Sequence, residues 1–183
     1  MSLEYKRLKL LQLNKKICDD LDKKFLFTSV GFFFDEDILF LGINPGYPYN
    51  KFHLDNALKM KNIEDQAERE KFYVSLLEDI YIGKFIKKIA GKNSLFDVSY
   101  TNIVKVPVEN NDMLKVKELL NIYRHYTDEQ IEILKPKIII CLGKFIVNEY
   151  FNINMNFNEI RKINDYEIIL LRHPAYYSRR IKL

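Results

Sequence analysis

Hydrophobic and polar residues form blocks along this chain that predict helices and strands. Residues 3–24 place leucines and isoleucines at helical spacing among charged residues, which predicts an amphipathic helix. The aromatic and β-branched run 25–34 predicts extended chain or a strand. Residues 37–43, "DILFLGI", are apolar almost throughout, which is typical of a strand covered on both faces.

The rest of the chain continues this pattern. Further strands are predicted at residues 95–106, 136–144 and 166–174. Helices are predicted at residues 54–71, 74–91 and 112–135, and another starts in 145–151. Gly91 is a plausible C-cap, and Pro107 begins a loop. Thr127 and Gln130 have capping-box spacing, so 112–135 is either one long helix or two.

Apolar strands that alternate with helices indicate a parallel sheet with helices on both faces. We therefore expect an α/β fold of three layers, α/β/α, around a central four-stranded parallel sheet. The length of 183 residues fits one domain over 1–183, in which residues 1–36 supply an N-terminal helix and a lead-in strand. Sheets of this kind bind ligands at the carboxyl ends of their strands.

Composition narrows the class of protein. Hydrophobic residues make up 48% and charged residues 30%, which suits a folded protein with a soluble surface. The net charge of +4 permits nucleic-acid binding without requiring it. Two cysteines cannot supply the four thiolates of a usual iron–sulfur cluster, and the histidines lack metal-ligand spacing. With no signal-peptide core and no membrane-spanning run, we expect a cytoplasmic protein.

Polar side chains stand where three predicted strands end. Asn44 either shapes its turn or is held still by Pro45 for chemistry. Asn102 offers one acceptor and two donors, which suits reading a base edge, although it could equally tie two loops together. His173 could donate to an oxygen that gains negative charge, or could be a structural histidine. The tail "RHPAYYSRR" mixes cations and aromatics, as nucleic-acid binders do, or is a solvated basic terminus.

Four ordered motifs at these strand ends resemble the uracil-DNA glycosylase superfamily. The run "GINPG" (42–46) resembles the first active-site motif of the mismatch-specific uracil-DNA glycosylases. The run "YTNIVKVPVENN" (100–111) resembles the base-recognition strand and loop of the thermostable bacterial and archaeal branch. The runs "EILKPKIIICLGK" (132–144) and "RHPAYYSRR" (172–180) resemble the superfamily's helix-to-strand junction and its second active-site motif.

The resemblance implies a role for each matching residue. Asn44, with the backbone of Gly42 and Ile43, would position the attacking water or stabilise the cationic sugar. Asn102 would pair with the uracil edge, and His173 would bond the base oxygen O2 as negative charge builds there.

An aromatic side chain is implied to stack on the flipped base. Tyr81 matches the expected motif, while Tyr47 and Phe52 are rivals because the segment between Gly46 and Tyr81 is long. The residues implied to contact DNA are Lys105, Lys144, Arg172, Tyr176, Tyr177, Arg179 and Arg180.

The resemblance implies a monomeric, monofunctional DNA glycosylase of base excision repair. It would flip uracil or a related deaminated base from DNA and hydrolyse its N-glycosidic bond, without a metal or cofactor. Two features depart from the thermostable branch: the cluster cysteines are missing, and Asn44 stands where that branch usually has an acid. An amide activates water poorly, so we expect a slow enzyme. The alternative is a member that binds nucleic acid or a nucleotide with weak or no catalysis.

A third reading is a small-molecule enzyme on an unrelated doubly wound fold. That reading predicts a glycine-rich phosphate loop, and the sequence contains neither G-x-G-x-x-G nor a P-loop.

Overall fold

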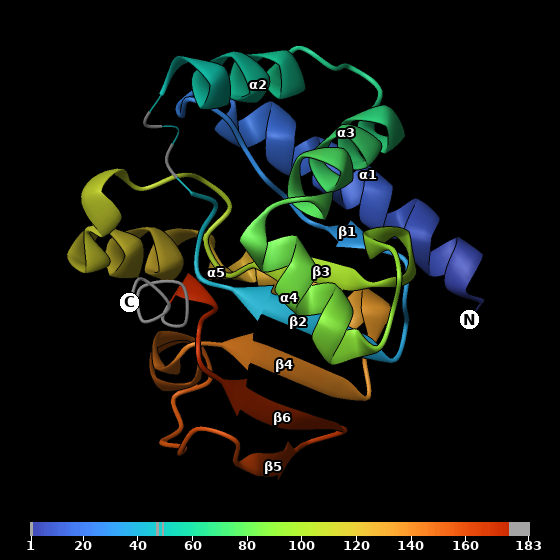
Figure 1. The fold of residues 1–183 in the computed structure, drawn as a ribbon, viewed down its shortest axis with the longest axis vertical. Helices are drawn as coiled ribbons and strands as arrows, with labels where there is room; N and C mark the ends of the chain where they lie inside the picture. Colours follow the sequence, from blue (N-terminus) through green and yellow to red (C-terminus); the bar gives the residue numbers. More distant parts are fainter. Residues whose placement is uncertain (1, 47, 49, 176–183) are drawn as a thin grey trace.

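The computed structural model describes residues 2–46, 48 and 50–175. Its centre is one mixed sheet in the order β1-β3-β2-β4-β6-β5 (Figure 1). The strands are β1 (Phe32–Phe33), β2 (Ile38–Gly42), β3 (Ser99–Asn102), β4 (Ile138–Leu142), β5 (Ile160–Ile163) and β6 (Tyr166–Leu171). The four inner strands are parallel, whereas β1 and β5 join the edges antiparallel. The predicted α/β fold with four parallel strands is confirmed, and two antiparallel edge strands enlarge the sheet.

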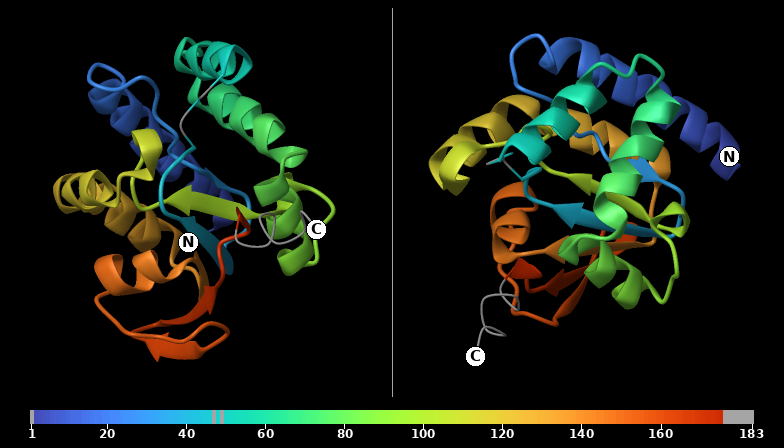
Figure 2. Two further views of the ribbon diagram at one scale, coloured as in Figure 1. Left: turned by 60° about the vertical axis from the view of Figure 1, so that its left-hand side comes forward. Right: turned by 45° about the horizontal axis from the view of Figure 1, so that its top comes forward.

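Helices cover both faces of this sheet (Figures 1 and 2). The α-helices are α1 (Leu3–Leu21), α2 (Lys51–Lys61), α3 (Gln66–Glu78), α4 (Tyr81–Ala90) and α5 (Met113–Leu134). Shorter turns of helix are η1 (Leu95–Asp97), η2 (Glu109–Asn111) and the π-helix η3 (Ile146–Tyr150).

Alternate strand residues face opposite layers, which is why the central strands β2 and β4 are apolar along their whole length. Leu41 and Cys141 pack in one buried cluster with α1, α5 and η3. Phe40 and Ile140 pack in a second cluster with α2, α3 and α4. Each such side chain contributes about 1.5–3 kcal/mol by leaving water. The three-layer arrangement therefore follows from the period of two in the strands.

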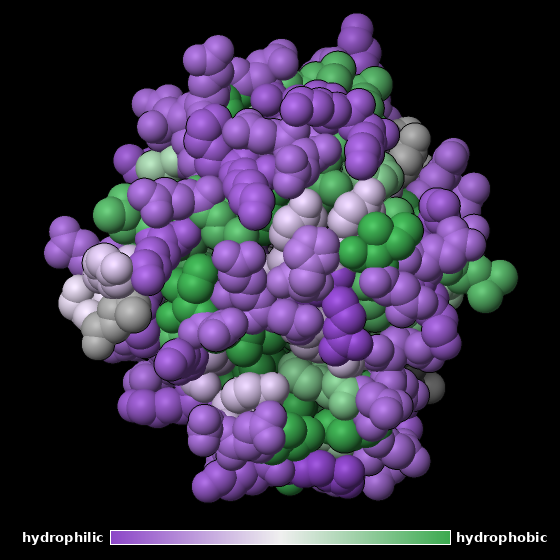
Figure 3. All heavy atoms as spheres, turned by 180° about the vertical axis from the view of Figure 1, so that it is seen from behind, coloured by the Kyte–Doolittle hydropathy of each residue, from purple (hydrophilic) through white to green (hydrophobic). Residues whose placement is uncertain are grey.

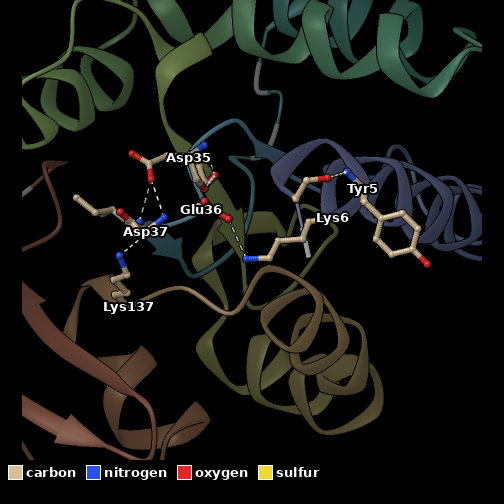
Figure 4. A network of polar contacts seen from close by, with 9 residues as sticks. Tyr5, Lys6, Asp35, Glu36, Asp37 and Lys137 are labelled. Carbon is tan, nitrogen blue, oxygen red and sulfur yellow. Dashed lines mark hydrogen bonds and ion pairs between the residues drawn. The ribbon is translucent and has the colours of Figure 1, made fainter.

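Charged side chains fix the amino end of β2, opposite the end where the predicted site lies. Asp35 accepts a hydrogen bond of 2.7 Å from the backbone N–H of Asp37. Asp37 pairs with Lys137 at 2.9 Å, and Glu36 pairs with Lys6 at 3.0 Å (Figure 4). Exposed pairs of this kind contribute about 1 kcal/mol or less each. These contacts fix the chain where it enters β2, and they bring no reactive groups together.

The outer surface is mostly polar. Seen from behind, hydrophilic residues cover most of the molecule, and hydrophobic ones gather in small groups between them (Figure 3). Within the described ranges, no helix combines the length and apolar character needed to cross a membrane.

Several predicted boundaries were wrong, one of them because a capping side chain overrides periodicity. The predicted helix 54–71 is broken before Asp65, whose carboxylate accepts from the Glu68 N–H at 2.8 Å and begins α3. The predicted helix 74–91 is broken at Ile80, although Gly91 does end α4 in the left-handed conformation, with φ 66°. The predicted strand 95–106 is a strand only at Ser99–Asn102.

Two further expectations need correction. Thr127 does not cap a second helix, because it lies inside α5 and its hydroxyl donates to the Asn102 carbonyl at 3.3 Å. Residues 112–135 therefore form one helix. The hairpin of β5 and β6 was missed, although its two-residue turn begins with Asn164, whose φ of 51° asparagine tolerates well.

Candidate functional site

The carboxyl ends of β3, β2, β4 and β6 lie at one edge of the sheet, as the sequence predicted. Gly42 at the end of β2 pairs with Asn102 at the end of β3. A Cβ on Gly143, which follows β4, would lie 3.9 Å from Ile43 Cδ1 and 4.0 Å from His173 Cβ. The structure therefore brings the ends of all four parallel strands together around these residues.

The Asn102 side chain is enclosed on the α2–α4 side of the sheet. Its Oδ1 accepts a 2.8 Å hydrogen bond from the Tyr100 hydroxyl. A Cβ on Gly42 would lie 2.4 Å from Asn102 Oδ1, so only glycine leaves room for the amide. Asn102 is 0% exposed, and among the described residues its Nδ2 has no hydrogen-bond partner. A buried donor without a partner is costly, so this atom calls for a ligand or another explanation.

Tyr73 of α3 lies beside this amide. Burial raises the pKa of Tyr73, while the neighbouring Ser29 and Asn102 side chains lower it in part. No hydrogen bond of normal geometry joins Tyr73 to Asn102 Nδ2 or to Ser29 Oγ, since both atoms lack a partner within the described residues. The amide is thus buried beside two tyrosines, and burial strengthens any polar contact made there.

Lys105 lies on the opposite side of the end of β3 and is 1% exposed. Its ammonium donates to the Asn102 carbonyl at 2.5 Å, to Gln130 Oε1 at 2.6 Å and to Thr101 Oγ1 at 2.9 Å. Burial lowers the pKa of Lys105 well below its usual value. The prediction that Lys105 contacts DNA is wrong, because the surrounding chain encloses the ammonium. Its hydrogen bonds fix the backbone that carries Asn102.

His173 lies two residues after the end of β6 and is half-buried. Its Nδ1 accepts a 3.2 Å hydrogen bond from the Ala175 N–H, and burial lowers the pKa of the imidazole. A neutral imidazole that accepts at Nδ1 carries its proton on Nε2. The ring is therefore prepared to donate a hydrogen bond through Nε2 at neutral pH.

Asn44 is half-buried, and its Nδ2 donates to the Pro45 carbonyl at 2.9 Å. This is the turn-shaping arrangement that the sequence left open as one alternative. The same bond holds the side chain in one orientation, so the turn-shaping and catalytic interpretations are compatible.

A cavity of about 290 Å³ opens beside the first motif. It is lined by Phe27, Pro45, Gly46, Pro48, Phe52, His53, Asn56, Ala57, Met60, Tyr73, Leu76, Leu77 and Ile80. Of the three candidates for stacking, Phe52 lines this cavity and is 71% exposed. Tyr81 is the first residue of α4, is 43% exposed and does not line it. Tyr47 lies outside the described residues.

Two cations that the sequence assigned to DNA lie on one aromatic ring. Arg172 lies 4.3 Å and Lys144 5.6 Å from the centre of the Phe157 ring. Because Arg172 precedes His173 directly, this pair adjoins the candidate site. The other proposed DNA contacts, Tyr176, Tyr177, Arg179 and Arg180, lie outside the described residues.

Within the part of the chain that the structure describes, no three His, Cys, Asp or Glu side chains form a metal site. Cys18 and Cys141 are buried and unbridged. Burial raises the pKa of Cys18 to about 12 and that of Cys141 further, so neither is a reactive thiolate at neutral pH.

The fold and this edge define the class of protein: a doubly wound α/β protein whose polar groups gather at the carboxyl ends of parallel strands. The family model of the uracil DNA glycosylase superfamily matches residues 30–182, and the chain belongs to this superfamily. The predicted resemblance is confirmed at the level of the superfamily. Membership supports a DNA-glycosylase type of function with DNA as the partner. The comparison with curated proteins gave no match.

Sequence reasoning missed the side chains that hold the site. Tyr100 precedes Asn102 by two residues on a strand, so both point to the same face, and this signal was available. Gln130 is a polar residue on the mainly apolar buried face of α5, which was a second signal. The contact of Phe157 with Arg172 had no signal, because the two residues come from different segments.

Proposed function

We propose that this chain is a monofunctional DNA glycosylase that removes uracil or a related deaminated base by hydrolysis of the N-glycosidic bond. The observation that carries the proposal is that Asn102 and the neutral His173 lie at the same edge of the parallel sheet, at the end of β3 and just after β6, with β2 and β4 between them. Asn102 brings a buried Nδ2 donor that has no partner among the described residues. Both groups suit a base that leaves with negative charge. Superfamily membership supports the same chemistry.

In the proposed reaction the target nucleotide leaves the base stack, at a cost of about a few kcal/mol. The cavity beside Pro45 and Phe52 would receive the base, with Phe52 stacking on it. Lys144 and Arg172 would hold DNA phosphates near that opening, since they are cations next to the site.

Cleavage of the bond places positive charge on the sugar and negative charge on the base. Nε2–H of His173 would donate to base oxygen O2, and Asn102 Nδ2 would donate to a second base oxygen. On the other face of the sugar, Asn44 has committed Nδ2 to Pro45, which leaves Oδ1 to orient the attacking water or to stabilise the cationic sugar. An amide cannot take the proton of that water as a carboxylate does, so the enzyme should be slow.

The test uses labelled oligonucleotides that carry uracil, hypoxanthine or xanthine. Each is presented single-stranded and opposite each normal base, and alkali then cleaves any abasic site. Excision that disappears in Asn102→Ala and His173→Ala supports the proposal. Asn121→Ala and His125→Ala serve as controls, because both residues are exposed on α5. Wild-type protein that makes no abasic site from any of these bases overturns it.

A second candidate is a member that binds nucleic acid or a nucleotide without cutting the glycosidic bond. Two observations favour it: Asn44 is an amide bound to its own turn, and Asn102 is fully buried. This function predicts tight binding of the same oligonucleotides with no alkali-labile product.

A further inference from the structure

Two contacts of β3 bear on which bases the site accepts. Tyr100 and Asn102 lie on the same face of the strand, and the Tyr100 hydroxyl donates to Asn102 Oδ1 at 2.8 Å. Burial raises the pKa of Tyr100 well above its usual value, so the phenol keeps its proton and remains a donor. Gly42 lets Oδ1 lie against the end of β2, where any side chain would displace it.

An asparagine amide can be placed in two ways that differ by exchange of Oδ1 and Nδ2. In the exchanged orientation Nδ2 would face the Tyr100 oxygen, and the phenol proton would lose the acceptor that it has among the described residues. Because Tyr100 is buried, that loss would leave a polar hydrogen unpaired away from water. The phenol oxygen could itself accept from Nδ2 in that orientation, so the hydroxyl selects between the two once a base carbonyl is present. Only with Oδ1 facing Tyr100 do the phenol proton and Nδ2 then both have an acceptor.

We propose that Tyr100 is a specificity-determining residue: by holding Oδ1, it makes Asn102 present N–H donors to the base and so favours bases with a carbonyl at that edge over bases with an amino group. Deamination replaces an exocyclic amino group with a carbonyl oxygen, so this edge separates uracil from cytosine. A carbonyl would pair the buried Nδ2, whereas an amino group would set one donor against another.

The amide lies one side chain away from the cavity. Tyr73 lines the cavity and also lies beside Asn102. Since Asn102 is 0% exposed, a base that reaches Nδ2 must displace the side chains that cover it. Asn102 Nδ2 thus becomes available to select the base only when a nucleotide has entered the site.

This inference rests on the proposed function for its base-binding site, but its test does not need catalysis. The probes are oligonucleotides with one 2′-fluoro-arabino-uridine or one 2′-fluoro-arabino-cytidine, whose glycosidic bonds resist cleavage. Fluorescence anisotropy gives a Kd for each, and their ratio is the measured preference. Uracil-containing DNA tested in parallel for excision reports on the proposed function separately.

Tyr100→Phe keeps the buried ring and removes the donor, so the preference for uridine should fall about 2- to 10-fold. Tyr150→Phe is the matched control, because Tyr150 is also buried and donates to Asp128 at 2.6 Å, away from Asn102. Thermal melting of both variants confirms that they fold.

A Tyr100→Phe protein with the wild-type preference, an equal change in Tyr150→Phe, or a wild-type protein without preference overturns the inference. A preference for uridine that Tyr100→Phe weakens, in a protein that excises nothing, supports the inference and overturns the proposed function alone.

Discussion

Gly42→Ala tests whether close packing at the end of β2 holds the site together. The added Cβ would lie 2.4 Å from Asn102 Oδ1 and 2.6 Å from the Tyr100 hydroxyl oxygen. Neither group can retreat easily, because Asn102 is 0% and Tyr100 5% exposed. Overpacking of this kind costs about 1–3 kcal/mol, and loss of the Tyr100–Asn102 hydrogen bond costs about 0.5–1.5 kcal/mol. The free energy of unfolding should fall by about 2–4 kcal/mol in total.

Gly46→Ala is the matched control within the same motif. A Cβ at Gly46 would meet no atom within 4 Å, so this substitution should leave stability almost unchanged. For a chain of this length the Gly42→Ala loss corresponds to a fall in Tm of about 4–16 °C. Both variants are melted by circular dichroism and assayed for uracil excision in single turnover.

The excision rate of Gly42→Ala should fall at least about 10-fold, since a shift of roughly 1.4 kcal/mol in the barrier is enough. Two results would refute the reasoning. One is a Gly42→Ala protein that melts within about 1 °C of wild type, which would mean that the amide has room to move. The other is a loss of stability with full excision, which would remove Asn102 from base recognition.

Three further predictions concern the other groups of the site. Asn44→Asp supplies a carboxylate for water activation and should raise the single-turnover excision rate at least about 10-fold; an equal or lower rate would contradict the role given to Asn44. Burial lowers the pKa of His173, so the excision rate should be level through neutral pH and decline only below about pH 6.5. The free energy of unfolding should also fall below that pH, because the histidine of the unfolded chain takes up a proton first. His173→Gln should remove this pH dependence of stability in urea titrations. Gln130→Leu removes an acceptor of Lys105 and leaves Asn14 Oδ1 without its 2.7 Å donor. The free energy of unfolding measured in urea should therefore fall by about 2–4 kcal/mol. A fall of less than about 1 kcal/mol would contradict the stabilising role of these hydrogen bonds.

The sequence was sufficient to predict the parallel sheet and the edge of the sheet where the candidate site lies. Runs such as "DILFLGI" and "PKIIICLGK" favour strands covered on both faces, because they are short, apolar and rich in isoleucine and other strand formers. Asn102 and His173 were found because polar residues after such runs stand out, and the order of motifs supported the superfamily.

The sequence was not sufficient to predict how individual side chains pack. The resemblance implied that Lys105 contacts DNA, yet its ammonium is buried among three oxygens from Thr101, Asn102 and Gln130. Lysines are almost never fully buried, so nothing in the sequence indicated this. Two of these oxygens come from residues next to one another, but Gln130 comes from α5 and joins only through tertiary structure. The break at Ile80 was missed because it has no proline or capping side chain.

The arrangement around Asn102 explains how an enzyme with an amide at its first motif could still act on a base. On one side of the sheet Lys105 holds the carbonyl of Asn102, and on the other Tyr100 holds its Oδ1. The residue is thus fixed through backbone and side chain, so little reorganisation is needed when a base accepts from Nδ2. In the proposed reaction Asn44 contributes little to water activation, so the site would rely on stabilising the departing base. Substitutions at Tyr100 and Gly42, which touch the amide directly, should therefore slow the reaction more than substitutions around Asn44.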